Sequence, residues 1–252
     1  MPNLPTHIYF ALSTLDDMKV DFLDEYLEAY MLGSTSPDIR AITKKNRSVY
    51  HFVDLDFESV GEGIYNLKSQ YPKWANLSGC SDETKAFMMG YVSHLVLDET
   101  YITKVFRPYF MNNDIFPIIP QRLIWDRAFQ LFLDIKYWDD NVKTNSNLLK
   151  DYSINIDVDF MRNEPVGEWK ELMLKLVSNS VFNWDRLITM SKRIARRDNI
   201  NEFDLAKVTE EFLVNPKEGI NNIMEKLPDN LVSDFEKDSN DNIILLVNEF
   251  IR

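Results

Sequence analysis

The longest apolar pattern in the chain has the period of an α-helix. Its members lie four or seven residues apart and so share one helical face: Phe87, Tyr91, Leu95 and Ile102. Ser81 precedes the pattern and carries a hydroxyl that can cap a helix N-terminus, and Asp82 and Glu83 follow in the first turn. We therefore predict one long helix from Ser81 to about Phe106, before Pro108.

Shorter patterns of the same period occur on both sides of this helix. Two sets near the N-terminus have helical spacing: Ile8, Leu12 and Leu15, then Phe22, Tyr26 and Ala29. We expect further helices at 120–139, 166–178, 180–197, 202–213 and 240–251, with a polar connector over 144–165. The chain has only 7 glycines and few alternating apolar and polar runs, which disfavours a sheet. The predicted fold class is all-α, a multi-helix bundle in a single domain, 1–252, with a core at 1–140 and a C-terminal helical extension at 166–252.

The charge balance limits the classes of partner. Forty acidic residues against 28 basic ones give a formal net charge of −12, which disfavours nucleic acid as a partner. The one basic cluster forms a stripe that could meet phosphate but is more typical of a solvated helix face: Lys192, Arg193, Arg196 and Arg197.

Cysteine content and hydropathy indicate a cytoplasmic protein. Cys80 is the only cysteine, so an internal disulfide cannot form, and its polar surroundings indicate an incidental thiol. Charged residues interrupt every apolar run before it reaches the length of a transmembrane span, and a basic segment followed by a long apolar core is absent from the N-terminus. We therefore expect no transmembrane segment; the oligomeric state stays open.

The histidines and two aspartates carry the strongest functional signal. The three histidines, His7, His51 and His94, all lie in apolar segments. His94 and Asp98 are four residues apart on the predicted long helix, which places both side chains on one face. Either a metal ion or a histidine hydrogen bond removes the cost of burying the carboxylate, so this pair alone does not decide between them. With Asp38, just after a glycine-containing turn, two histidines and two aspartates form a ligand set that zinc accepts.

Four short segments place these residues in a fixed order. They are Thr-His-Ile-Tyr-Phe-Ala at 6–11, Leu-Gly-Ser-Thr-Ser-Pro-Asp-Ile at 32–39, His-Phe at 51–52 and Met-Gly-Tyr-Val-Ser-His-Leu-Val-Leu-Asp at 89–98. In this order they resemble the zinc-dependent phospholipase C family, in its broad bacterial and archaeal branch, over roughly residues 1–110. The resemblance implies a phospholipase C-like bundle with a metal site between helices. It implies one zinc ion bound by Asp38, His51, His94 and Asp98, and His7 on a neighbouring ion bridged by Asp98.

The chain also differs from secreted members of that family. Those members carry two further histidines and a glutamate for another zinc ion, whereas this sequence has no histidine after His94. Asp126, on the predicted helix 120–139, could supply a substitute carboxylate, with Asp134 and Glu99 as weaker candidates; a salt bridge from Asp126 to Arg122 or another cation is an equal alternative. We expect one or two zinc ions, or iron or manganese, with the candidate ligands His7, Asp38, His51, His94, Asp98 and Asp126.

These residues predict a hydrolase. A metal ion with an open coordination position lowers the pKa of bound water and can act on a phosphoester. We therefore predict a metal-dependent phosphodiesterase resembling phospholipase C, with Asp38 or Asp98 as the catalytic base and Arg107 or Arg127 near the phosphate. The expected substrate is a lipid headgroup or a smaller soluble phosphoester, and the acidic balance favours the latter.

Two alternatives stay open on the sequence alone. One is a metalloenzyme of another reaction type on the same helical scaffold. The other is a non-catalytic helical protein that binds a partner. Other catalytic classes lack support, because the sequence contains no glycine-rich phosphate loop, no Cys-x-x-Cys motif and no Gly-x-Ser-x-Gly motif.

Overall fold

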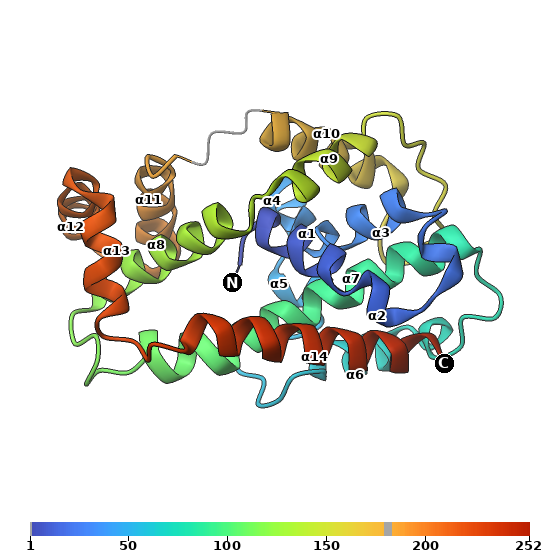
Figure 1. Ribbon diagram of the computed structural model, residues 1–252, viewed down its shortest axis with the longest axis horizontal. Helices are drawn as coiled ribbons and strands as arrows, with labels where there is room; N and C mark the ends of the chain where they lie inside the picture. The colour runs from blue at the N-terminus through green and yellow to red at the C-terminus, as the bar shows by residue number, and fades with distance from the viewer. Residues whose placement is uncertain (1, 179–182) are drawn as a thin grey trace.

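The computed structural model describes residues 2–178 and 183–252, and over these residues the protein consists of helices and loops without strands (Figure 1). The α-helices are α1 (Leu4–Ser13), α2 (Leu15–Met18), α3 (Leu27–Gly33), α4 (Arg40–Thr43), α5 (Arg47–His51), α6 (Glu62–Gln70), α7 (Asp82–Tyr101), α8 (Ile119–Tyr137), α9 (Asp140–Leu148), α10 (Asn163–Ser178), α11 (Arg186–Asp198), α12 (Glu202–Val214), α13 (Pro216–Met224) and α14 (Leu231–Ile251). Short segments η1 (Asp21–Leu23), η2 (Ser36–Ile39), η3 (Pro72–Ala75) and η4 (Ile102–Phe110) lie between them. The predicted all-α class is confirmed.

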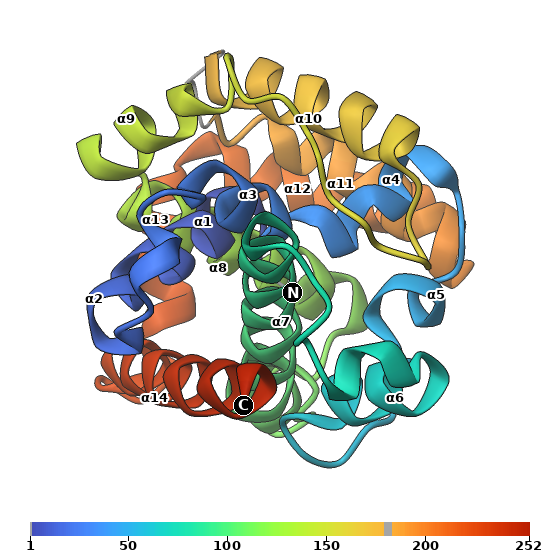
Figure 2. The ribbon, with the colours of Figure 1, turned by 90° about the vertical axis from the view of Figure 1, so that its right-hand side faces the viewer.

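Helix α7 runs through the middle of the molecule with other helices around it (Figure 2). Seventeen of its 20 residues are buried, so it is covered on all sides. Ser81 caps it as predicted, since the Oγ accepts a hydrogen bond from the Thr84 backbone N–H at 3.2 Å. The helical path does not end at Phe106: wider π-type turns carry it through Pro108 to Phe110.

Helices α3 and α7 approach so closely that each needs a glycine at the crossing. A Cβ atom built on Gly90 would lie 2.8 Å from the Ser34 backbone nitrogen, and one on Gly33 would lie 2.9 Å from the Phe87 carbonyl carbon. Real Cβ contacts of this kind are not made at such distances, so only glycine lets the two backbones touch. The chain after Gly33 therefore lies directly against α7, with Ser34 fully buried.

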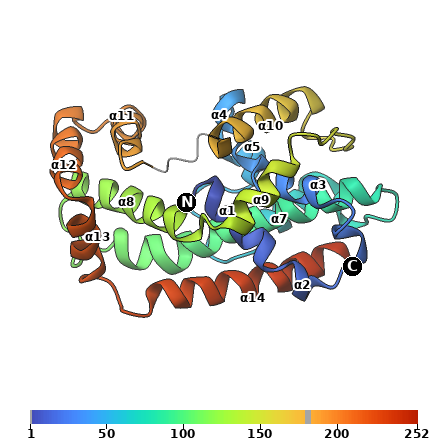
Figure 3. The ribbon, with the colours of Figure 1, turned by 45° about the horizontal axis from the view of Figure 1, so that its top comes forward.

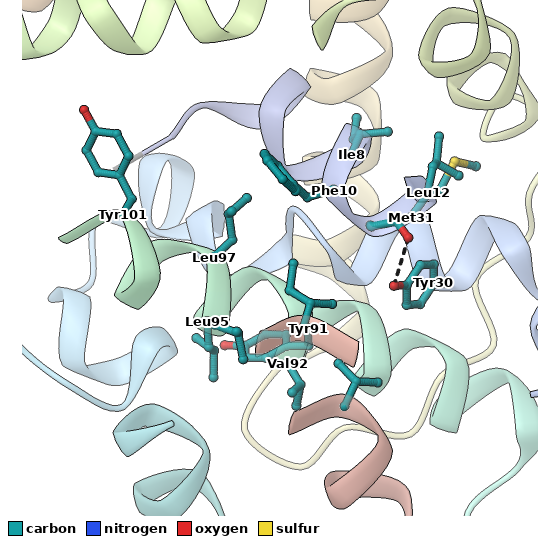
Figure 4. Packing of buried hydrophobic residues seen from close by; sticks show 14 of the residues in the cluster. Ile8, Phe10, Leu12, Tyr30, Met31, Tyr91, Val92, Leu95, Leu97 and Tyr101 are labelled. Carbon is teal, nitrogen blue, oxygen red and sulfur yellow. Dashed lines mark hydrogen bonds between the residues drawn. The ribbon is translucent and has the colours of Figure 1, made fainter. Parts of the chain in front are cut away.

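The hydrophobic core joins the first and last helices through α7. Figure 4 shows part of it, including the Tyr30 hydroxyl, which donates a hydrogen bond to the Ala11 carbonyl at 3.1 Å. Helix α14 lies along α7 (Figures 1 and 3), and Asn242 Nδ2 donates to Thr100 Oγ1 at 3.2 Å. The Phe235 ring of α14 meets the rings of Phe10 and Tyr101 edge to face. Segments from both ends of the chain thus share one core.

The predicted helices agree with the structure in position more closely than in extent. Helices α8, α10 and α12 lie within one to three residues of their predicted bounds, and α11 spans most of its predicted segment, of which 180–182 lie outside the described residues. The predicted connector 144–165 is wrong at its start, because α9 extends to Leu148 with Asp139 Oδ1 accepting from the Val142 N–H at 2.8 Å. Helix α13 was not predicted, and α14 starts nine residues before 240.

The N-terminal pattern of Phe22, Tyr26 and Ala29 does not form one helix face. The chain turns between η1 and α3, so these residues fall on separate elements, and only Ala29 is fully buried. Over 2–178 and 183–252, each helix is either too short or too polar to cross a bilayer.

Candidate metal centre

Five polar side chains from four elements meet beside α7. His7 comes from α1, Asp38 from η2, His51 from the end of α5, and His94 and Asp98 from neighbouring turns of α7. The side chain of Asp38 is 27% exposed, whereas those of His51 and Asp98 are 0% and 1% exposed. Four of the five groups are therefore enclosed, and the cluster reaches solvent at Asp38.

One atom from each of three side chains lies close to the other two. His51 Nε2 lies 3.3 Å from His94 Nε2 and 3.2 Å from Asp98 Oδ2, and His94 Nε2 lies 3.7 Å from the same oxygen. Asp38 Oδ1 lies 3.8 Å from His51 Nε2. Tetrahedral ligands placed about 2.0–2.1 Å from a zinc ion lie roughly 3.3 Å from one another. The spacing and the ligand types therefore fit one divalent ion.

His7 forms a second group with residues of the first. Its ring stacks on that of His94, with centroids 3.7 Å apart and planes 7° from parallel, and its Nε2 lies 3.4 Å from Asp98 Oδ1. Ligand atoms lie within 4.8 Å of one another in two sets of three: His7, His94 and Asp98, and Asp38, His51 and His94. His94 belongs to both sets.

The orientation of His94 follows from the crossing of α3 and α7. His94 Nδ1 lies 2.8 Å from the carbonyl oxygen of Ser34, the residue after Gly33. A carbonyl oxygen can only accept, so Nδ1 carries the proton and Nε2 keeps its lone pair toward the cluster. A backbone acceptor on the distal nitrogen is the usual support of a metal-ligating histidine.

Several buried polar atoms of the cluster lack a hydrogen-bond partner among the described residues. They are both ring nitrogens of His7, His51 Nδ1 and Asp98 Oδ1. Buried polar atoms without partners are rare in folded proteins because losing water costs about 1–3 kcal/mol each. His7 Nε2 and Asp98 Oδ1 are donor atoms that a metal ion would satisfy, which supports the fit.

The local electrostatics favour the protonation states that a metal requires. Burial lowers the pKa of His51 below its ordinary value, and the positive charge of Arg47 lowers it further. Burial also lowers the pKa of His94 well below its ordinary value. Burial alone would raise the pKa of Asp98, but Arg47 and the neighbouring histidines lower it well below its ordinary value. Neutral imidazoles beside an ionised carboxylate are the forms that bind a metal ion.

Comparison with known families agrees with this geometry. Residues 6–101 match the zinc dependent phospholipase C family. The matched region contains all five residues of the cluster and ends at the last residue of α7. Searches of curated proteins and of solved structures returned no match. The predicted resemblance over roughly residues 1–110 is confirmed, and residues 102–252 lie outside the match to zinc dependent phospholipase C.

Arg47, within the region that matches zinc dependent phospholipase C, is a member of the site that the sequence analysis missed. Its Nη2 atom donates to Asp98 Oδ2 at 2.9 Å, and its side chain is 7% exposed. Arg47 lies four residues before His51, so both project from the same face of α5. That spacing was a usable signal, but only a structure shows that this face meets α7.

The predicted substitute ligand Asp126 lies in a different hydrogen-bond network. Its oxygens accept from the Tyr101 hydroxyl at 2.8 Å and from Gln130 Nε2 at 2.9 Å, and Arg127 Nε lies 3.9 Å away. Asp126 is in neither set of clustered ligand atoms found among the described residues. Its role as a ligand stays a prediction, and the cation near it is Arg127 rather than Arg122.

The two weaker carboxylate candidates also have other partners. Asp134 accepts from Thr6 Oγ1 and Asn3 Nδ2, each at 2.8 Å, and so fixes the start of α1 against α8. Glu99 accepts from the backbone N–H groups of Gly61 and Gly63, the latter at 2.8 Å. Burial raises the pKa of Glu99 to about 7. Asp134 thus holds α1, which carries His7, and Glu99 holds the start of α6 beside α7.

The arginines expected near the phosphate have structural partners as well. Arg107 donates to the Leu55 carbonyl at 2.7 Å and lies 4.7 Å from the centre of the Phe57 ring. Arg127 donates to Gln130 Oε1 at 2.7 Å. Of the three arginines considered, Arg47 is the one in contact with a residue of the cluster.

Proposed function

We propose that the protein is a metal-dependent hydrolase of phosphoesters, with one or two zinc ions bound at this centre. The observation that carries the proposal is the convergence of His51 Nε2, His94 Nε2 and Asp98 Oδ2 within 3.2–3.7 Å of one another, with Asp38 beside them. The match of residues 6–101 to zinc dependent phospholipase C supports the same chemistry.

The residues of the cluster have separable roles in this proposal. Asp38, His51, His94 and Asp98 hold the ion, and His7 completes the set from the side of α1. A bound zinc ion would act as a Lewis acid toward the phosphoryl group and make the attacking water more acidic. Asp38 is the partly exposed carboxylate, so its free oxygen is placed to take the proton from that water. Asp98, enclosed and hydrogen-bonded to Arg47, serves mainly to orient the centre.

The proposed substrate class is a phosphodiester, either a lipid headgroup or a smaller soluble ester. Both present the same anionic phosphoryl group to the centre. The family resemblance favours the lipid, while the formal charge of −12 disfavours close approach to an anionic membrane surface.

Elemental analysis by mass spectrometry on purified protein tests the metal part of the proposal. The wild type should carry zinc, iron or manganese near or above one equivalent, and His94→Ala and Asp98→Asn should lose most of it. Asp54→Asn is the matched control, because Asp54 is an exposed acid close in sequence to α5 but outside the cluster. A wild type that stays metal-free after incubation with each metal would contradict the proposal.

Hydrolysis assays then separate the substrates. Metal-loaded wild type is given bis(p-nitrophenyl) phosphate in solution and, separately, phosphatidylcholine vesicles. Cleavage of the first alone identifies a soluble phosphodiesterase, and release of phosphocholine from the vesicles identifies a phospholipase C activity. Bound metal with neither activity, over a panel of phosphoesters, would point to a metalloenzyme of another reaction type.

A further inference from the structure

Helix α11 exposes a face that is rich in positive charge. The helix lies with α12 and α13 at one end of the molecule (Figures 1 and 3). On one side, Ile194 and Ala195 pack into a small core with residues of α8 and α12. The basic stripe recognised in the sequence lies on the other side, and all four of its side chains are exposed: Lys192, Arg193, Arg196 and Arg197. Helix α11 contains five basic residues and one acidic residue, in a chain that has 28 and 40.

Most of this charge is not neutralised within the chain. Lys192, Arg193 and Arg196 form no ion pair with the described residues, and only Arg197 has a partner, its Nε lying 2.6 Å from Asp198 Oδ1. Helix α12 packs beside α11 and carries four acidic residues, but none of them pairs with α11 over residues 183–252. The stripe therefore presents positive charge to a partner outside the chain.

Apolar side chains beside the stripe favour an anionic bilayer as that partner. Ile188 lies one turn before Lys192 on α11 and is 43% exposed, and Phe203, at the start of α12, is 73% exposed. Basic and apolar side chains on one exposed helix are typical of helices that lie in the headgroup region of a membrane, with the apolar groups inserted. Nucleic acid would meet the charges through its phosphates but has no apolar phase for Ile188.

The formal net charge of −12 disfavours approach to such a surface in a random orientation, but not contact through α11. At physiological ionic strength, interactions between exposed charges are screened beyond about 8 Å, so a bilayer responds mainly to the face next to it. Helix α11 has 13 residues and is about 20 Å long, so the whole stripe can meet headgroups at once. Each basic residue near an anionic leaflet strengthens binding about fivefold.

From these observations, we propose that α11 is a docking surface for anionic bilayers, with the basic stripe on the lipid headgroups and Ile188 inserted among them. The inference concerns binding rather than hydrolysis. It gives a role to a part of the chain that lies outside the match to zinc dependent phospholipase C, which ends at residue 101.

Sedimentation with vesicles tests the inference. One set of vesicles contains phosphatidylserine and phosphatidylcholine in equal parts, and the other contains phosphatidylcholine alone. We expect the wild type to bind the first set and not the second. The triple variant Lys192→Gln, Arg193→Gln, Arg196→Gln should bind the mixed vesicles about 100-fold more weakly, at about fivefold for each charge removed.

A second triple variant is the matched control. Lys217→Gln, Lys226→Gln, Lys237→Gln removes three exposed positive charges from outside α11, so both variants have the same net charge. The control should bind the mixed vesicles as the wild type does. A wild type that does not bind them, a stripe variant that binds as tightly as the wild type, or a control that loses as much affinity as the stripe variant would each overturn the inference.

Two further measurements identify the partner. Ile188→Ser should weaken binding to the mixed vesicles about fivefold, because it removes an inserted apolar group, and an unchanged affinity would count against a bilayer. Fluorescence anisotropy with labelled duplex DNA measures the competing interaction. If the wild type binds DNA more tightly than the mixed vesicles, and the stripe variant loses this binding, the stripe belongs to nucleic acid and the inference is overturned.

These results are independent of the proposed function. Vesicle binding is measured without turnover and on protein treated with EDTA, so a protein without hydrolase activity can still show it. A protein that hydrolyses phosphoesters but does not bind the mixed vesicles would keep the proposed function and lose this inference.

Discussion

Replacing Gly90 with alanine should destabilise the protein, although alanine is the better helix former. In an exposed helix interior this change would stabilise by about 1 kcal/mol. Here the added Cβ would lie 2.8 Å from the Ser34 nitrogen and 2.9 Å from the Tyr30 carbonyl carbon, where ordinary contacts start near 3.4 Å. The atoms it meets belong to backbone and cannot move aside as a flexible side chain can.

The expected magnitude follows from two contributions. Forcing helices α3 and α7 apart costs about 1–3 kcal/mol, the usual range for overpacking a core. The same movement draws the Ser34 carbonyl away from His94 Nδ1 and weakens a buried hydrogen bond of about 1 kcal/mol. After the gain in helix propensity is subtracted, Gly90→Ala should lose about 1–3 kcal/mol of unfolding free energy.

Urea denaturation followed by circular dichroism measures this loss. Gly167→Ala is the matched control, because Gly167 lies in helix α10 and an added Cβ there meets no atom within 4 Å. The control should gain up to about 1 kcal/mol. If Gly90→Ala proves as stable as the wild type or more stable, the close crossing of α3 and α7 is wrong, and so is the account of how His94 is oriented.

Three further predictions concern the metal, a buried carboxylate and a helix cap. Removal of metal with EDTA should lower the free energy of unfolding by about 3 kcal/mol at a free zinc concentration near 100 times Kd, measured as a fall in Tm that is absent in His94→Ala. Burial raises the pKa of Asp134 to about 6, above its value of 3.8 in an unfolded chain, so this group contributes stability below about pH 4 that is lost as pH rises to about 6. Asp134→Asn should therefore reduce the fall in unfolding free energy over that range by up to about 3 kcal/mol, and an unchanged pH profile would contradict it. Ser81→Ala should cost about 1 kcal/mol by urea denaturation, because it removes the cap on the Thr84 N–H, whereas Ser78→Ala, outside any helix, should not.

The sequence alone predicted the positions of those helices whose buried residues are apolar and recur with the helical period. Helix α7 directly follows its cap, Ser81, and is buried along most of its length, so local signals located its start. Helix α9 buries only Val142 and Ser146 and has no such face. It forms because it packs against other helices and because Asp139 caps it. A periodic apolar pattern contains no information on either contribution.

The candidate site was predictable as a set of residues but not as a geometry. Histidines in apolar segments, Asp98 at helical spacing from His94, and Asp38 in a segment that resembles the family identified the five side chains that the fold brings together. Arg47 and the Ser34 carbonyl were missed because their roles depend on which faces of α3, α5 and α7 meet, a long-range property. The hydrogen bond from Tyr101 to Asp126 was missed for the same reason, since it joins α7 to α8.

The order of the elements along the chain has a consequence for biosynthesis. All five clustered side chains have been made once residue 98 is in place, whereas α14, which lies along α7, is the last of the described helices to be made. A nascent chain therefore holds all five candidate ligands while the side of α7 that α14 covers is still exposed. Metal captured at that stage would tie α1, η2, α5 and α7 together in advance, and the later helices would fold onto a scaffold already joined by coordination.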